Sequence, residues 1–106
     1  MALLRRTEEL ILLAILQLYE NAYGVTIRRH LIEITGEHFS FASVYAPLDR
    51  LTQQGYVTAI DGLPTKERGG RRRRFYRVTP AGLAALTEME RVRNALRQGV
   101  PQLTFG

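Results

Sequence analysis

The sequence contains no cysteine in its 106 residues and only two histidines, His30 and His38. The absence of cysteine excludes a disulfide framework, a thiolate nucleophile and a zinc site of the zinc-finger type. The two histidines are not spaced as a metal-binding pair, and no cluster of acidic residues accompanies them. We therefore expect a protein that is not an enzyme and that needs no metal ion or cofactor.

The sequence also lacks a hydrophobic run long enough to span a membrane, since its uninterrupted apolar stretch covers only residues 10–16. Arg5 and Arg6 precede this stretch, as basic residues do in a secretory signal. However, Glu8 and Glu9 lie between them and the apolar run, and no small-residue cleavage site follows. These features predict a cytoplasmic protein without membrane contact.

Lysine is nearly absent as well, because Lys66 is the single lysine beside fourteen arginines. The planar guanidinium group of arginine matches phosphate oxygens better than an ammonium group does. The segment KERGGRRRRFYR, residues 66–77, holds seven cationic side chains and one acid, whereas the rest of the chain is about neutral. Like charges this close repel one another unless an anion neutralises them. The segment is therefore either a surface for an anionic partner or a solvated basic loop.

The first half of the chain has the pattern of three helices in one small globular domain. Thr7 is the expected N-cap of a first helix that ends near Tyr19 and is apolar on nearly every side, so it must be covered on more than one face. Gly36 is expected to end a second helix, and Ser40 to cap a third that ends near Gln54. The expected inward residues of the second and third helices are Ile27, Leu31, Ile34, Val44, Leu48 and Leu51. Two short helices joined by a tight turn predict a helix-turn-helix.

The second half changes from helical to strand periodicity. The β-branched and aromatic runs YVTAI, from Tyr56, and RFYRVT, to Thr79, predict a β-hairpin with a long basic tip. Thr79 and Pro80 are a typical N-cap and first position of a last helix, which Gly99 and Pro101 end. Its apolar stripe comprises Leu83, Leu86, Met89, Val92 and Leu96.

This order of elements predicts a mainly α protein with a small β-hairpin: a winged helix-turn-helix with an additional C-terminal dimerisation helix. We expect residues 1–79 to form the DNA-binding domain, and residues 80–106 to form the dimerisation helix and tail of the same compact unit. The basic hairpin would then be the wing, whose guanidinium groups reach phosphates beside the groove that the third helix enters.

The outward side of the third helix supplies further DNA-binding candidates. The alanines are small enough for a close approach to the groove floor, whereas the serines could bind phosphate, cap the helix or do both. Tyr45 could stack, donate to a phosphate or pack beneath the wing. The candidates on the helix and wing are Ser40, Ala42, Ser43, Tyr45, Arg50, Lys66, Arg68, Arg71, Arg72, Arg73 and Arg74. Pro47 predicts an irregular helix start, or a start as late as Ser43.

The stretches AYGVTIRRHLIEITGEHFSFASVYAPLDRLTQQGYV and RGGRRRRFYRVTPAG resemble the PadR-like transcriptional regulators, over about residues 10–86. The resemblance implies a dimeric repressor whose third helix enters the major groove while the wing touches the backbone or the minor groove. It matches Tyr23, Tyr45, Arg73 and Arg74 to residues of the family's DNA-binding motifs.

The resemblance further implies that the last helix packs against the first helix of the other subunit. The dimer residues expected on these helices are Leu10, Leu13, Leu83, Leu86, Met89, Val92 and Leu96. A palindromic DNA operator and a small apolar effector at the dimer interface are the implied partners. The alternative is a winged-helix protein-interaction or RNA-binding module without operator specificity.

Overall fold

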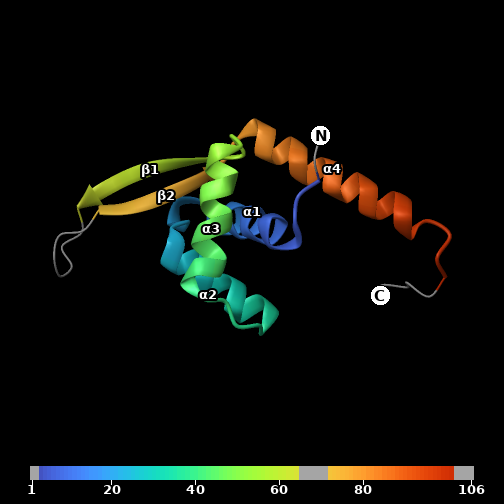
Figure 1. The fold of residues 1–106 in the computed structure, drawn as a ribbon, viewed down its shortest axis with the longest axis horizontal. Helices are drawn as coiled ribbons and strands as arrows, with labels where there is room; N and C mark the ends of the chain where they lie inside the picture. The colour runs from blue at the N-terminus through green and yellow to red at the C-terminus, as the bar shows by residue number, and fades with distance from the viewer. Residues whose placement is uncertain (1–2, 65–71, 102–106) are drawn as a thin grey trace.

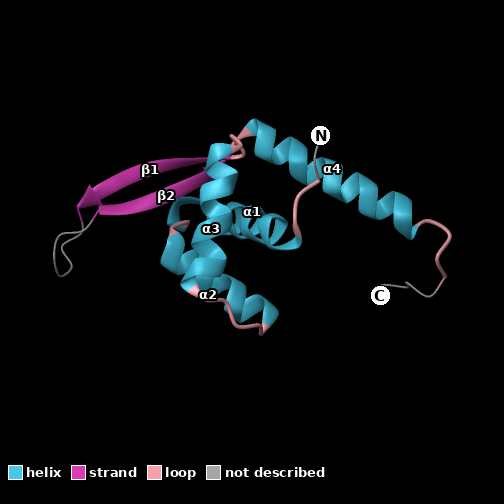
Figure 2. Cartoon of the chain, in the orientation of Figure 1, coloured by secondary structure: helices cyan, strands magenta, loops and turns pink. Residues whose placement is uncertain are grey.

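The computed structural model describes residues 3–64 and 72–101. Its main elements follow the expected order of three helices, a hairpin and a last helix (Figure 2). They are α1 (Arg6–Leu18), α2 (Gly24–Thr35), α3 (Phe41–Gln53), β1 (Val57–Pro64), β2 (Arg72–Val78) and α4 (Pro80–Arg97), with a short 3-10 turn η1 (Tyr19–Asn21) between α1 and α2. The predicted winged helix-turn-helix is confirmed.

The hairpin and α4 extend from opposite sides of a body formed by the first three helices (Figure 1). The body's core is aliphatic, and α1 lies against both α2 and α3 within it. The largest fully buried side chains are Ile11, Leu12, Ile15, Ile27, Val44, Leu48, Leu51 and Val57. The hairpin and α4 are thus mounted on a rigid helical support.

The start of α1 differs from the prediction. Thr7 lies inside the helix, and Arg5 occupies the N-cap position instead. The Glu8 carboxylate accepts a hydrogen bond from the Arg5 backbone N–H at 2.8 Å, so a side chain of the first turn satisfies a donor that an N-cap hydroxyl usually does not reach. The expected N-cap at Thr7 was therefore wrong.

Helix α2 begins after Tyr23, whose backbone N–H donates to Thr26 Oγ1 at 3.0 Å. Gly36 ends it in the left-handed conformation, with φ of 71°, as predicted. Ile34 was expected to point inward but is 63% exposed. It lies near the last turn of α2, in the lining of an open groove between α2 and α1.

Helix α3 runs without a break from Phe41 to Gln53 although it contains Pro47. The Ser40 hydroxyl caps it by accepting from the Ser43 N–H at 3.1 Å, which confirms the predicted cap. Pro47 is buried and lies in the second turn, so the helix tolerates the missing donor without the irregular or late start that the sequence suggested.

Strands β1 and β2 pair in antiparallel register from Val57 opposite Val78 to Asp61 opposite Arg74. The register shifts before the last pair, Pro64 with Arg72. The segment before α2 adds a third, minimal strand, because the Tyr76 N–H donates to the Ala22 carbonyl at 2.8 Å. The hairpin is therefore hydrogen-bonded to the start of the helix-turn-helix.

Helix α4 begins at Pro80 with Thr79 as its N-cap, as predicted; the Thr79 hydroxyl accepts from the Gly82 N–H at 3.1 Å. Gly82 lies so close to the turn between α3 and β1 that a Cβ atom on this residue would be 2.3 Å from the Tyr56 carbonyl oxygen. This close approach holds the first turn of α4 against the base of the hairpin, from which the helix extends outward (Figure 1).

Candidate nucleic-acid interface

The outward face of α3 carries short side chains. Ala42, Ser43 and Ala46 are all exposed, and Ser40 is exposed at the cap. Both serines have a structural role, since Ser43 Oγ donates to the Ser40 carbonyl at 2.8 Å while Ser40 Oγ accepts from the Ser43 N–H. Because these exposed side chains are short, a second molecule can approach the backbone closely at the start of α3.

Tyr45 lies on the flank of α3 that faces the start of α2. A Cβ atom built on Gly24 would be 2.1 Å from Tyr45 Oη, so the phenol ring occupies the space above that glycine. The ring is still 37% exposed. The packing explains why glycine follows Tyr23, and it leaves one side of the phenol open to solvent.

Phe41 is a candidate that sequence reasoning missed. It is the first residue of α3 and is 54% exposed. The Arg28 guanidinium lies 4.5 Å from the centre of its ring, and the Tyr45 ring stacks on it at 6.1 Å. The available signal was an aromatic residue directly after the N-cap, in register with the inward stripe of Val44, Leu48 and Leu51 but at the open end of the helix.

Tyr23 joins the hairpin to the start of α2. The Arg73 guanidinium lies 4.6 Å from the centre of the Tyr23 ring, and Phe75 contacts the same ring edge-on at 5.6 Å. A β-bridge between Tyr23 and Phe75 supports these contacts. Tyr23 and Arg73, both expected at the DNA surface, are thus brought together, and their contact fixes where the hairpin leaves the body.

The remaining wing candidates are only partly within the described residues. Arg74 is exposed, and its Nε lies 3.5 Å from Asp61 Oδ1 on the paired strand. Lys66, Arg68 and Arg71 lie outside the described residues, and Arg72 is described only as the first residue of β2. An exposed cross-strand pair of this kind is weak, so Arg74 can exchange Asp61 for another anion at little cost.

Arg50 is placed differently from the other candidates. Its Nε lies 3.6 Å from Glu8 Oε2 and is buried without a hydrogen-bond partner, while the side chain as a whole remains 41% exposed. Glu8 is itself buried, as is Glu9, which pairs with Arg93 of α4. Arg50 therefore links α3 to α1, a role that the sequence did not predict.

The expected dimer residues fall into two groups. Leu10, Leu86 and Met89 pack against the core of their own chain, and Val92 is half-buried. The other members point away from the core, where Leu13 is 45%, Leu83 46% and Leu96 74% exposed. A groove of about 670 Å³ lies between α1 and α4, with Leu13, Leu16, Leu83 and Leu86 in its lining.

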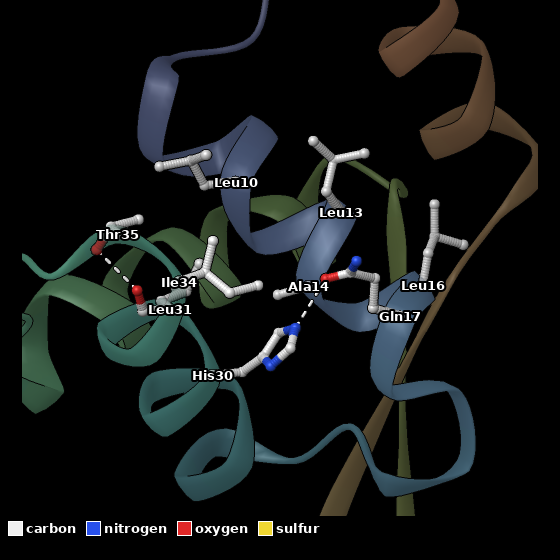
Figure 3. A pocket seen from close by; sticks show the side chains of 9 residues that line it. All are labelled: Leu10, Leu13, Ala14, Leu16, Gln17, His30, Leu31, Ile34 and Thr35. Carbon is white, nitrogen blue, oxygen red and sulfur yellow. Dashed lines mark hydrogen bonds between the residues drawn. The ribbon is translucent and has the colours of Figure 1, made fainter.

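A second groove, of about 430 Å³, lies between α1 and α2 (Figure 3). Its lining is mainly aliphatic and consists of Leu10, Leu13, Ala14, Leu16, Gln17, His30, Leu31, Ile34 and Thr35. His30 Nε2 and Gln17 Oε1 lie 2.7 Å apart and form a hydrogen-bonded pair across it. The groove therefore combines apolar walls with one polar pair that joins the two helices.

Within residues 3–64 and 72–101, no group of three or more histidine, aspartate or glutamate side chains is arranged to hold a metal ion. No helix in the same ranges has the length and apolar character needed to cross a membrane.

Comparison with known proteins places this arrangement among the PadR-like regulators. The model of the transcriptional regulator PadR-like family matches residues 12–88. A PadR family regulator from Eggerthella lenta is 31% identical over 89% of this chain and 80% of its own, with a TM-score of 0.67. No curated protein matches the chain in sequence.

Two further solved structures share the fold at lower identity. A transcriptional regulator from Clostridium thermocellum is 20% identical, covers 92% of both chains and has a TM-score of 0.70. A PadR family regulator from Clostridium difficile is 18% identical, with 92% of this chain and 97% of that chain covered, also at 0.70.

Proposed function

The chain belongs to the PadR-like family of transcriptional regulators, and from that membership we propose that it acts as a homodimeric repressor of a palindromic DNA operator. It is a regulator and not an enzyme. The family implies DNA-binding regulation. The proposal adds that the protein is a dimer, that it represses transcription, and that its operator is palindromic. As a repressor it would act in the cytoplasm.

The observation that carries the proposal is that α3 and the hairpin both contact the start of α2, where Tyr45 of α3 packs over Gly24 and Arg73 of β2 packs on Tyr23. The start of α3 offers Ala42, Ser43 and Ala46 as a low, exposed surface, and Tyr23 stacks with Arg73 of β2 beside it. An α-helix fits the major groove, and small residues let its backbone approach the base edges. We assign base contacts to α3 and Tyr45, and phosphate contacts to Ser40 and Ser43.

The charge of the wing supports the same assignment. Residues 66–77 carry a net +6 in a chain whose total is +5, so the positive charge is concentrated on the hairpin segment. Lys66, Arg68, Arg71, Arg72 and Arg74 would contact the DNA backbone or the minor groove, which supplies affinity without reading sequence. Arg73 would hold the wing in place through Tyr23. Arg50, turned toward Glu8, would support α3 rather than lead in binding phosphate.

Dimerisation is supported by the leucines that α1 and α4 leave exposed. Leu13, Leu83 and Leu96 are each at least 45% exposed, and Leu13 and Leu83 line the groove between the two helices. Exposed apolar surface of this extent is typical of a protein interface. A two-fold axis would place α4 of one chain against α1 of the other, with residues 80–106 as the dimerisation helix and tail.

A small apolar effector is supported by the groove between α1 and α2. Its volume of about 430 Å³ lies in the range of small-molecule sites, and the His30–Gln17 pair offers one polar anchor among aliphatic walls. Titration with planar aromatic compounds, followed by NMR of labelled protein, tests this role. Shifts at Leu31 and His30 that disappear in Ile34→Asp support it, and the absence of such shifts in the wild type contradicts it.

Selection of bound sites from random duplex DNA, followed by footprinting, tests the main proposal. We expect two protected half-sites with inverted sequence, about one helical turn apart. A single protected patch would contradict the palindromic operator. Binding without sequence preference would favour the alternative, a protein-interaction or RNA-binding module.

A further inference from the structure

Phe41 presents a large apolar ring to solvent at the first residue of α3. The side chain is 54% exposed, and the next two residues of the helix are the short Ala42 and Ser43. Phe41 continues the register of the buried Val44 and Leu48, three and seven residues further along α3. At the start of the helix, however, its own chain leaves more than half of the side chain uncovered, so the ring offers apolar surface to solvent.

The ring is also held in a defined position. The Arg28 guanidinium lies 4.5 Å from the ring centre, and Arg28 is fixed by donating from Nε to the Phe39 carbonyl at 2.7 Å. The Tyr45 ring also stacks on Phe41, at an angle of 21°, and Tyr45 itself packs over Gly24. A ring held by two neighbours loses little freedom when it makes a further contact.

The occupant that fits this ring is a thymine base. In recognition helices of this type the N-terminal residues contact base edges, and Phe41 is the first residue of α3. The thymine C5-methyl group is the apolar feature that base edges display in the major groove, and phenylalanine contacts it. The cationic surroundings of the ring, Arg28 beside it and the exposed Arg29 on α2, match a phosphate-flanked base better than an apolar protein surface.

We propose that Phe41 reads one thymine in each operator half-site through its C5-methyl group. This inference rests on the proposed DNA-binding function and deepens it, because it names a specificity-determining residue and the chemical group that it recognises. Phe41 contributes apolar contact alone, so exchanging the methyl for hydrogen removes the interaction while base pairing and phosphate charge stay unchanged.

The test replaces each thymine of the selected operator by deoxyuridine, one symmetric pair of positions at a time, and measures the dissociation constant by fluorescence anisotropy. For the wild-type protein we expect one pair of positions at which loss of the methyl weakens binding roughly three- to fivefold for each half-site. For Phe41→Ala the same replacement should leave the dissociation constant unchanged. Phe41→Leu, which keeps an apolar side chain, should retain part of the effect.

Leu3→Ala is the matched control, because Leu3, which precedes α1, is 52% exposed and lies outside the proposed DNA, effector and dimer contacts. It should show the wild-type sensitivity at the same positions. If Phe41→Ala binds weakly, lower salt brings it into range, since salt acts on the phosphate contacts common to both duplexes. Circular dichroism checks that each variant is folded.

Two results overturn the inference without affecting the proposed function: no thymine position responds in the wild type, or the same position responds equally in Phe41→Ala. Failure of the wild-type protein to bind any selected duplex would overturn the proposed function, and this inference with it.

Discussion

Gly24 shows how a single small residue positions the candidate interface. The Tyr45 phenol fills the space where a Cβ atom at Gly24 would lie, 2.1 Å from Oη. Gly24→Ala should therefore displace the ring and lower the free energy of unfolding by about 1–3 kcal/mol. In a Tyr45→Ala background the same substitution should be neutral or stabilising, because alanine favours helix more than glycine does. Urea unfolding of the four proteins measures the difference; equal costs in both backgrounds would contradict the packing.

Tyr76 provides a prediction about alkaline pH. Its side chain is 4% exposed, and burial raises the pKa of its phenol above the ordinary value, with Arg74 opposing part of the rise. The folded state then holds the phenolic proton more tightly than the unfolded chain. The contribution of the phenol to the free energy of unfolding is fully present below about pH 10, and it is lost as the pH rises through the raised pKa of the folded state. Urea unfolding between pH 8 and 11 should show a steeper loss of stability for the wild type than for Tyr76→Phe, and parallel curves would contradict this.

At the level of elements, the sequence was sufficient where local patterns determine the structure. The caps at Ser40 and Thr79 and the stop at Gly36 follow from residue type, and each was predicted correctly. The start of α1 was missed because a glutamate, Glu8, replaces the usual N-cap side chain. Ile34 was misplaced because helical spacing does not tell whether another element covers a face.

The candidate site was harder to predict than the elements, because it depends on contacts between distant segments. The Arg50–Glu8 pair joins α3 to α1, and the Tyr23–Arg73 stack joins the start of α2 to β2. The sequence does not tell which partner Arg50 or Arg73 contacts, because it offers several acids and aromatic rings to each arginine. Phe41 was overlooked for the same reason, since its exposure depends on what α2 leaves uncovered.

The wing should act as an electrostatic element that is indifferent to sequence. Replacing Arg68, Arg71 and Arg72 together by alanine should weaken binding to all duplexes alike and reduce the slope of log K against log salt by about 0.9 for each lost phosphate contact. Arg91→Ala is the matched control, because Arg91 is an exposed arginine of α4 that pairs with Glu88. Fluorescence anisotropy at several salt concentrations measures both, and an altered base preference in the triple variant would contradict the role.

Helices α1 and α4 should drive dimerisation through their exposed leucines. Leu96→Glu and Leu13→Glu place a charge on side chains that are 74% and 45% exposed, so the monomer fold should persist while the mass measured by light scattering halves. Leu86 is unsuitable for this test, because it packs against the core of its own chain. Val25→Glu, 43% exposed on α2, is the control that should remain dimeric. Unchanged mass in both leucine variants would contradict the interface.

At the scale of the whole molecule, the hairpin and α4 lie far apart. The basic hairpin extends from one side of the three-helix body and α4 from the other, so the proposed DNA contacts and the proposed dimer contacts would use different surfaces (Figure 1). Because the chain outside residues 66–77 is about neutral, two copies can associate through α1 and α4 without strong repulsion. A two-fold arrangement would then present two α3 helices and two wings to one duplex.

The most direct measurement of this account is sedimentation equilibrium of the protein with a duplex that carries its selected operator, at about physiological ionic strength. We expect two chains on each full operator, with affinity that falls steeply as salt is raised. One chain per duplex, or no complex at this ionic strength, would contradict it.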